Sequence, residues 1–431
     1  MNVQKSVAVL CFLILLSPAS FSQRVNPTID SLIHLVTPES YRIHFDSLRT
    51  HKGCFRKVTE ADKQSSDHDA CRDYIYRTLK KYLGKGNVYF HHFEVGYNKG
   101  LTNILAYKEG KTPSNGILIL SAHYDSNNNR EPGDIEAVCS PGANDNGSGV
   151  AAILEIARVL SGVETDNSIL FAAWDLEEQF PNGFAGGSNN WFLDHIDQKN
   201  KICFSDFESG GKINIERVIA NINFDMFGHP NDTINGRPVL WACSGNKIHS
   251  NFVDEYVSVF NRYIPNVTAL NHGKLIYSDH FTFAARKIPS VENLESGYDK
   301  DPFYHTCSDN LENIKNINFN FAAEVTRGGM AFALWKAGII LKFDKSSHFD
   351  SSMIHLFELP DAYFLELPED DFSAIIIDQF GNHIKAFERG GIVFFNPSVS
   401  SLCRLYIYNS KDRISRNIYL QKKGEHLSSF F

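Results

Sequence analysis

The sequence lacks several features that would place it outside the ordinary globular proteins. It has only 15 prolines and 29 glycines in 431 residues, which excludes collagen-like and low-complexity material. It has no run of five like charges, and its net charge is only −8, so neither a basic nucleic-acid-binding face nor a disordered acidic tail is supported. No segment reaches the roughly 20 apolar residues of a membrane-spanning helix. With 43% hydrophobic residues, the chain is predicted to be globular, with about two to three domains.

The first 22 residues have the pattern of a secretory signal peptide. Lys5 supplies a positive charge, residues 7–16 form an unbroken apolar run, and small residues follow up to Ser22. Because the apolar run is too short to span a membrane, we expect cleavage near Ser22 and a secreted or periplasmic mature chain.

Export changes the interpretation of the cysteines. Eight occur, and Cys11 lies inside the predicted signal peptide, so the mature chain would hold an odd number. An oxidising compartment permits disulfides, and the odd number leaves at least one thiol unpaired. Cys54 and Cys71 are the first pair that we expect, because they lie close together in one polar segment. No CxxC pattern occurs, so a thiolate zinc cluster is not predicted.

Short apolar runs alternate with amphipathic segments between residues 67 and 336. The apolar runs have the length of buried strands, and the segments between them have helical spacing. This alternation predicts an α/β fold with a mostly parallel central sheet sandwiched by helices. Strands are expected at residues 88–95, 103–107, 116–122, 169–174, 218–224 and 288–293, and helices at residues 67–82, 189–196, 247–263 and 317–336 and after Gly149.

The pattern changes after Gly338. The runs at 372–378 and 383–387 flank a Gly-Asn pair, which is typical of a hairpin, and further strand-like runs continue to residue 420 without a helical pattern. A small β-rich domain is therefore predicted at the end of the chain. The predicted division is a signal peptide at 1–22, a main α/β domain at 23–344 and a β-rich C-terminal domain at 345–431.

Histidines and acidic residues follow the predicted strands, where the carboxyl ends of parallel strands form one edge of the sheet and active sites collect. The motifs are SAHYDS with His123 and Asp125, PGANDNGSG with Asp145, WDLEE with Glu177 and Glu178, NFDMFG with Asp225, and YHTCSD with His305 and Asp309. Each motif alone is typical of a solvated turn. Together, two histidines and three carboxylates are a suitable ligand set for two divalent metal ions that share a bridging carboxylate.

This order of motifs resembles the secreted bacterial di-zinc aminopeptidases, whose wider family includes glutamate carboxypeptidase II, the transferrin receptor and glutaminyl cyclase. The resemblance covers roughly residues 50–337. It implies a zinc-exopeptidase fold of the phosphorylase/hydrolase-like type, with residues 23–344 as the catalytic domain. It also implies two Zn²⁺ ions per chain and peptide substrates with a free N-terminus, which the enzyme would shorten by hydrolysis. It does not reach the C-terminal β-rich domain.

The resemblance also assigns the metal ligands by position. It implies that Asp145 bridges the two zinc ions. His123 and Asp225 would complete one site, and Glu178 and His305 the other. The same family has a cis peptide bond directly after the bridging aspartate, so a cis bond is expected after Asp145.

Three further residues receive roles from the resemblance. Glu177 would act as the general base on the water that the two zinc ions activate, and later as the general acid. Asp125 is expected to support the ring of His123, and Asp309 the ring of His305.

Two alternative functions remain open. Glutaminyl cyclases have similar acids and histidines but use one zinc to cyclise N-terminal glutamine. The loop at 179–188 is longer than aminopeptidases usually have, and cyclases have a still longer insert at this place. Against this alternative, residues 144–149 resemble the aminopeptidase motif, and Tyr304 stands where cyclases usually have tryptophan. A non-catalytic, receptor-like member would have lost metal ligands, whereas this chain retains all five.

Overall fold

The computed structural model describes residues 25–48, 66–96, 98–112, 116–130, 140–178, 186–197, 213–310, 313, 317–340 and seven strands between 355 and 420. The predicted signal peptide lies outside the described residues. Cys71 is buried, but Cys54 also lies outside them, so the expected pairing stays a prediction.

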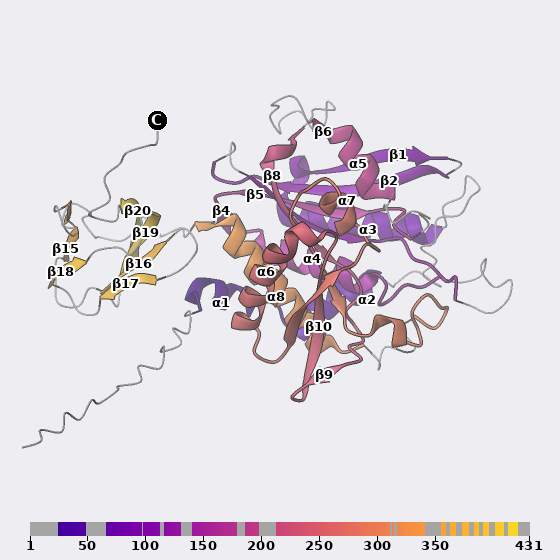
Figure 1. Ribbon diagram of the computed structural model, residues 1–431. Coiled ribbons are helices and arrows are strands. Elements are labelled where there is room, and N and C mark those ends of the chain that lie inside the picture. The colour runs from indigo at the N-terminus through magenta and orange to yellow at the C-terminus, as the bar shows by residue number, and fades with distance from the viewer. Residues whose placement is uncertain are drawn as a thin grey trace, which may run out of the picture.

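A nine-stranded mixed sheet forms the centre of the protein (Figure 1), in the order β1-β2-β5-β3-β8-β12-β10-β11, with β9 beside β10. The four strands β5, β3, β8 and β12 pair in parallel, whereas β2 and β10 join them antiparallel. The predicted parallel sheet is therefore right for the central strands, and the outer strands make the sheet mixed. The bounds are β1 Val88–Val95, β2 Asn98–Lys108, β3 Ile117–His123, β5 Ser168–Trp174, β8 Val218–Phe224, β9 Thr233–Ile234, β10 Arg237–Ser244, β11 Thr268–Lys274 and β12 Ser290–Glu295.

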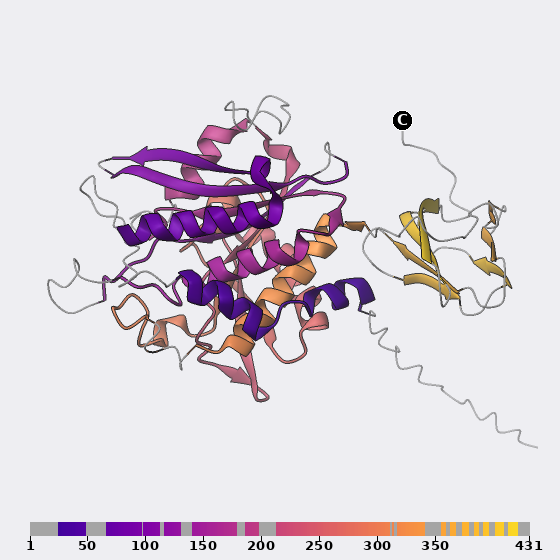
Figure 2. The same cartoon turned by 180° about the vertical axis from the view of Figure 1, so that it is seen from behind.

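Helices cover both faces of the sheet, as predicted. The larger buried cluster packs α1, α2, α3, α4, α6 and α8 on one face, most of which lie in front in Figure 2. The smaller cluster packs α5 and α7 on the other face. The bounds are α1 Pro27–Ile33, α2 Pro38–Leu48, α3 Ser66–Leu83, α4 Gly147–Leu160, α5 Gly186–His195, α6 Ser250–Tyr263, α7 His280–Ala284 and α8 Phe319–Ala337. No described helix is long and apolar enough to cross a membrane.

The central strands read as continuous apolar runs because both of their faces are buried. Every residue of β3 and of β5 is buried. Leu118 and Leu120 face the larger cluster, while Ile117 and Ile119 face the smaller one. This double burial is typical of parallel strands between two helical layers, and it makes the positions of β3 and β5 evident from sequence.

The C-terminal strands form two sheets of their own, in the orders β14-β15-β18 and β17-β16-β19-β20. The predicted hairpin is present, since β16 pairs antiparallel with β17. The bounds are β14 His355–Glu358, β15 Tyr363–Leu367, β16 Ser373–Asp378, β17 His383–Phe387, β18 Gly391–Phe395, β19 Ser401–Tyr408 and β20 Arg413–Leu420. The domain boundary at 344/345 stays a prediction.

Candidate metal centre

The five predicted ligands converge at the carboxyl edge of the central strands. His123 is the last residue of β3, Asp225 directly follows β8, and Glu178 lies four residues beyond β5. Asp145 lies just before α4, and His305 lies in the irregular segment between β12 and α8. The topology brings them together because β5, β3 and β8 are parallel neighbours whose carboxyl ends share one edge.

Asp145 lies between the two histidines. Its Oδ2 is 2.9 Å from His305 Nε2, and its Oδ1 is 3.4 Å from His123 Nε2. His305 Nε2 is also 3.0 Å from Glu178 Oε2, and His123 Nε2 is 3.3 Å from Asp225 Oδ1. Each oxygen of Asp145 therefore faces its own histidine and, beyond it, a second carboxylate.

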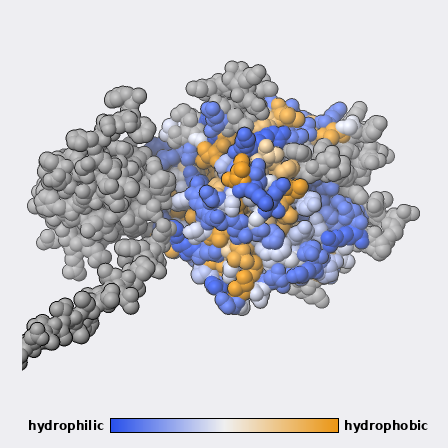
Figure 3. Space-filling model, in the orientation of Figure 1, coloured by the Kyte–Doolittle hydropathy of each residue, from blue (hydrophilic) through white to orange (hydrophobic). Residues whose placement is uncertain are grey.

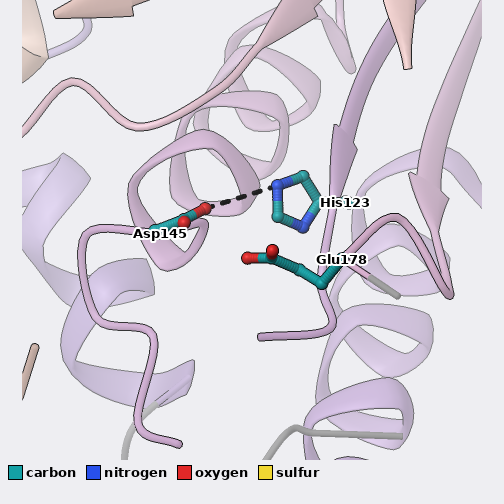
Figure 4. Close-up of side chains that lie close together, drawn as sticks. All are labelled: His123, Asp145 and Glu178. Atoms are coloured by element: carbon teal, nitrogen blue, oxygen red, sulfur yellow. Dashed lines mark ion pairs between the residues drawn. The ribbon is translucent and has the colours of Figure 1, made fainter. Parts of the chain in front are cut away.

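These side chains have the composition and spacing of a metal site. Ligand atoms of His123, Asp145 and Glu178 lie within 4.8 Å of one another, and Figure 4 shows the three side chains directed toward a common point. The Oε1 atom of Glu178 is buried, and none of the described residues forms a hydrogen bond with it. A buried carboxylate oxygen without a donor is costly unless a cation binds it. Imidazole with carboxylate ligands suits zinc, so the residues present fit this ion.

Without a bound ion, the side chains of this cluster have strongly shifted pKa values. Burial raises the pKa of Glu178 to about 7, with a further contribution from Asp145. Burial lowers the pKa of His305, but the Glu178 and Asp145 carboxylates outweigh it and raise that pKa to about 11. Burial likewise opposes ionisation of Asp145, but its hydrogen bonds with the two histidines hold its pKa well below the usual range. The carboxylates thus favour positive charge between them.

Asp125 connects His123 with the two adjacent glutamates. It is fully buried, and its Oδ1 lies 3.4 Å from His123 Nδ1. Oδ1 also accepts the backbone N–H of Glu177 at 3.0 Å, and Oδ2 accepts that of Glu178 at 3.1 Å. Asp125 therefore lies beside His123, where it was expected, and it also fixes the backbone of the Glu-Glu pair, which sequence alone did not indicate.

Asp309 has a different partner from the one expected. Its two oxygens accept the backbone N–H groups of Asn144 and Asp145, at 2.7 and 3.0 Å. The Nδ1 of His305 instead lies 3.1 Å from Asn129 Oδ1. The expectation that Asp309 supports His305 is corrected: it holds the backbone of the segment that carries Asp145.

The bond after Asp145 is the expected cis peptide. The next residue, Asn146, caps helix α4 by accepting the N–H of Gly149 at 2.9 Å, and its amide donates to the carbonyl of Phe224 at 2.8 Å. The start of α4 is thereby tied to the end of β8, which carries Asp225. Two of the predicted ligands are fixed relative to each other through this one asparagine.

Glu177 lies beside the five predicted ligands and is not itself one of them. Burial raises its pKa well above the usual range, and although His123 lowers it, Glu178 and Asp225 raise it further. A carboxyl group in such surroundings holds a proton more readily than one in water, and can accept and return it.

Sequence reasoning missed two buried residues, Asp175 and His68, that lie next to the turn with Glu177 and Glu178. Asp175 accepts the N–H of Thr102 at 2.9 Å, the hydroxyl of Tyr124 at 3.0 Å and the N–H of Leu176 at 3.0 Å, and it pairs with His68. Leu176 has a positive φ of 58°, a conformation that a leucine adopts only when its surroundings enforce it. Asp175 belongs to the WDLEE motif and could have been recognised there as a buried acid, whereas no motif around His68 indicates that it pairs with Asp175.

The mixed sheet between helical layers, with this cluster at its carboxyl edge, is the architecture of the zinc exopeptidases. Residues 103–328 match peptidase family M28, and the chain belongs to that family. This confirms the resemblance inferred from the order of the motifs.

Relatives in the family are named as aminopeptidases. The chain is 28% identical over 249 residues to aminopeptidase YwaD of Bacillus subtilis, covering 56% of this chain and 46% of that protein. It is 29% identical over 219 residues to leucine aminopeptidase 1 of Trichophyton rubrum, covering 50% and 53%. The chain thus spans about half the length of the curated relatives it matches.

Solved structures support the fold. The Legionella pneumophila LapA aminopeptidase aligns with a TM-score of 0.54 at 19% identity, covering 73% of this chain and 76% of that chain. Porphyromonas gingivalis glutaminyl cyclase aligns with a TM-score of 0.53 at 20% identity, covering 69% and 98%. At these identities the likeness establishes the α/β fold alone, and it includes both an aminopeptidase and a cyclase.

Proposed function

We propose that this protein is a secreted zinc aminopeptidase that binds two zinc ions per chain and removes N-terminal residues from peptides. The observation that carries the proposal is the position of Asp145, which offers one oxygen toward His123 and the other toward His305. A bridging carboxylate with a histidine and a second carboxylate on each side gives two complete ligand groups. Export is supported by the signal-like first 22 residues, and the peptide substrate by the names of the relatives.

The assignment of ligands follows from these distances. His123, Asp225 and one oxygen of Asp145 would hold the first zinc ion. His305, Glu178 and the other oxygen of Asp145 would hold the second. When bound, the two ions would polarise the scissile carbonyl and make a water molecule more acidic.

Glu177 would carry the proton in this reaction. Its carboxylate accepts a proton from the attacking water as the new C–O bond forms. It then returns that proton to the departing nitrogen as the peptide C–N bond breaks. Asp125 keeps Glu177 in place by accepting its backbone N–H, and it lies beside Nδ1 of His123, which leaves Nε2 of that ring as the nitrogen that would bind zinc.

The test combines metal analysis with two assays on the purified protein. Two zinc ions per chain, with leucine release from a Leu-peptide that falls about 10²–10⁴-fold in Glu177→Gln, would support the proposal. One zinc per chain with formation of pyroglutamate from a Gln-peptide would identify a cyclase instead. Absence of bound metal and of both activities would leave a receptor-like member of the family.

A further inference from the structure

Arg130 lies exposed beside the candidate metal centre. Its backbone N–H donates to the carbonyl of His305 at 3.1 Å. Its guanidinium carbon lies 4.4 Å from the centre of the Tyr304 ring, and that ring contacts the His305 imidazole in a tilted arrangement with ring centres 3.8 Å apart. Arg130 is thus attached through both its backbone and its side chain to the segment that carries His305.

One face of the Arg130 guanidinium lies over the Tyr304 ring, and the N–H groups along its edge remain available to bind an anion. Within the part of the chain that the structure describes, its N–H groups form no hydrogen bond or ion pair, and the ring contact is its one side-chain interaction. Arginine stays charged at every physiological pH and presents its donors in a planar fork that matches a carboxylate. Stacking on Tyr304 already restricts the orientation of this fork, so less conformational entropy is lost when an anion binds.

The distance from the centre suits a small peptide. The guanidinium carbon lies 4.4 Å from the centre of the Tyr304 ring, which lies 3.8 Å from the centre of the His305 imidazole, so the guanidinium is at most about 8 Å from that imidazole, a distance that two to three extended residues span. A substrate held at the zinc ions by its first residue would therefore bring groups of its first two or three residues to Arg130.

Electrostatics allow an anion at this position. The carboxylates of Asp145, Glu177, Glu178 and Asp225 are equal in number to the four positive charges of two divalent zinc ions, so the bound ions would offset them. The fixed charge of Arg130 then supplies the local positive potential beside the centre.

We propose that Arg130 binds a carboxylate of the substrate, and that the enzyme prefers short peptides with a carboxylate within the first two or three residues. The inference rests on the proposed peptidase function and specifies its substrate class. The carboxylate can be the C-terminus of a dipeptide or tripeptide, or the side chain of an aspartate or glutamate. Both sources offer the same planar anion to the guanidinium.

Kinetics on matched peptides separate these sources. We would compare kcat/KM for Leu-Ala with that for Leu-Ala amide, and for Leu-Glu amide with that for Leu-Gln amide. In Arg130→Ala, the acid-to-amide ratio or the Glu-to-Gln ratio should fall about tenfold, the usual effect of losing a hydrogen-bonded charge pair. Arg130→Lys should give an intermediate ratio, because it keeps the charge and loses the fork.

A matched control removes a positive charge elsewhere. Arg237→Ala deletes an exposed arginine that donates to the carbonyl of Pro265 near the β9–β10 hairpin, and it should leave both ratios unchanged. If Arg130→Ala also leaves both ratios unchanged while the wild type cleaves peptides, the inference about Arg130 is wrong and the proposed peptidase stands.

Calorimetry gives a readout without turnover. Leu-Ala should bind zinc-loaded Glu177→Gln about tenfold more tightly than Leu-Ala amide does, and the additional change Arg130→Ala should remove the difference. Equal affinities for the two peptides, together with equal affinities for Leu-Glu amide and Leu-Gln amide, would overturn the inference. If the wild type cleaves no peptide at all, the proposed function fails, and these affinities still report whether Arg130 binds a carboxylate.

Discussion

The Nε2 of His68 lies 2.9 Å from Oδ1 of Asp175, and both side chains are fully buried. Burial lowers the pKa of the His68 ring, but Asp175 outweighs this effect and raises it. The pair joins helix α3 to the turn that presents Glu177 and Glu178. A contact between residues far apart in sequence thus supports the proposed base and one proposed zinc ligand.

Replacing Asp175 tests this support. Each oxygen of its carboxylate accepts a backbone N–H group that can only donate, Oδ1 from Leu176 and Oδ2 from Thr102, so in Asp175→Asn the new NH₂ group would face one of these donors and leave it unpaired. We expect a loss of about 1–3 kcal/mol in the free energy of unfolding and a lower kcat in the folded fraction. Urea unfolding and kcat at saturating substrate measure the two effects.

The control for that prediction is a buried histidine of α2. His44 hydrogen-bonds to Tyr74 at 3.1 Å and lies 3.5 Å from Glu155. His44→Ala should lower stability but leave kcat unchanged, since these contacts do not reach the sheet edge. If both variants lost the same fraction of kcat, the effect would be one of general stability and not of support for the glutamates.

Asp309 should influence both metal sites at once. It holds the backbone of Asp145, the residue that both sites would share. Asp309→Ala is therefore expected to weaken zinc binding about 10–100-fold at both sites, as loss of a supporting hydrogen bond commonly does. Zinc titration with a competing chelator measures this, and Asp232→Ala, which removes an exposed carboxylate paired with Lys300, serves as the control. Loss confined to one site would contradict the shared position of Asp145.

Metal removal should lower thermal stability. A ligand that binds only the folded state at 100 times its Kd stabilises that state by about 2.7 kcal/mol, so chelation should reduce Tm and added zinc should restore it. Differential scanning calorimetry with and without chelator gives this shift. In His305→Ala the zinc-dependent shift should shrink without vanishing, because the ligands around His123 remain. An unchanged shift in that variant would remove His305 from the ligand set.

The buried Glu155 makes stability depend on pH. Burial raises its pKa, but hydrogen bonds from Arg158, His44 and Ser40 outweigh burial and lower the value from 4.5 to about 2. Because the folded pKa lies below the unfolded one, the stabilisation is complete above about pH 4.5 and is lost as the pH falls toward 2. At neutral pH it is on the order of 3 kcal/mol.

Comparison of the wild type with Glu155→Gln checks this pH dependence. The difference in unfolding free energy should be largest above pH 5 and shrink on acidification, measured by urea unfolding between pH 7 and pH 3. A difference that stayed constant over this range would show that the carboxylate charge is not responsible.

Much of the fold and site could be predicted because β3, β5 and β8 are buried on both faces. Such strands read as apolar runs, and the polar residues that end them mark the carboxyl edge. His123, Glu178 and Asp225 were evident for this reason, without any knowledge of their distances.

The unpredicted features depend on contacts that the local sequence does not encode. Helices α1 and α2 were missed because they are short and are held by distant partners, as when Tyr41 donates to the carbonyl of Ser148. The partner of Asp309 differs from the one that the resemblance gave, His305, because the fold places the backbone of Asn144 and Asp145 against it.

The exposed side chains Leu35, Ile248 and Tyr277 come from separate segments, and Figure 3 shows hydrophobic residues interspersed with hydrophilic ones on the visible face.

The five side chains of the candidate centre come from five separate segments of the chain, and no two of them are neighbours in sequence. Bringing them together requires closure of several long loops, which is the slow, entropically costly part of folding. An unfolded chain would offer zinc only scattered single ligands. Metal uptake during refolding should therefore occur late and in step with the final cooperative phase, so that zinc itself reports when the sheet edge has assembled.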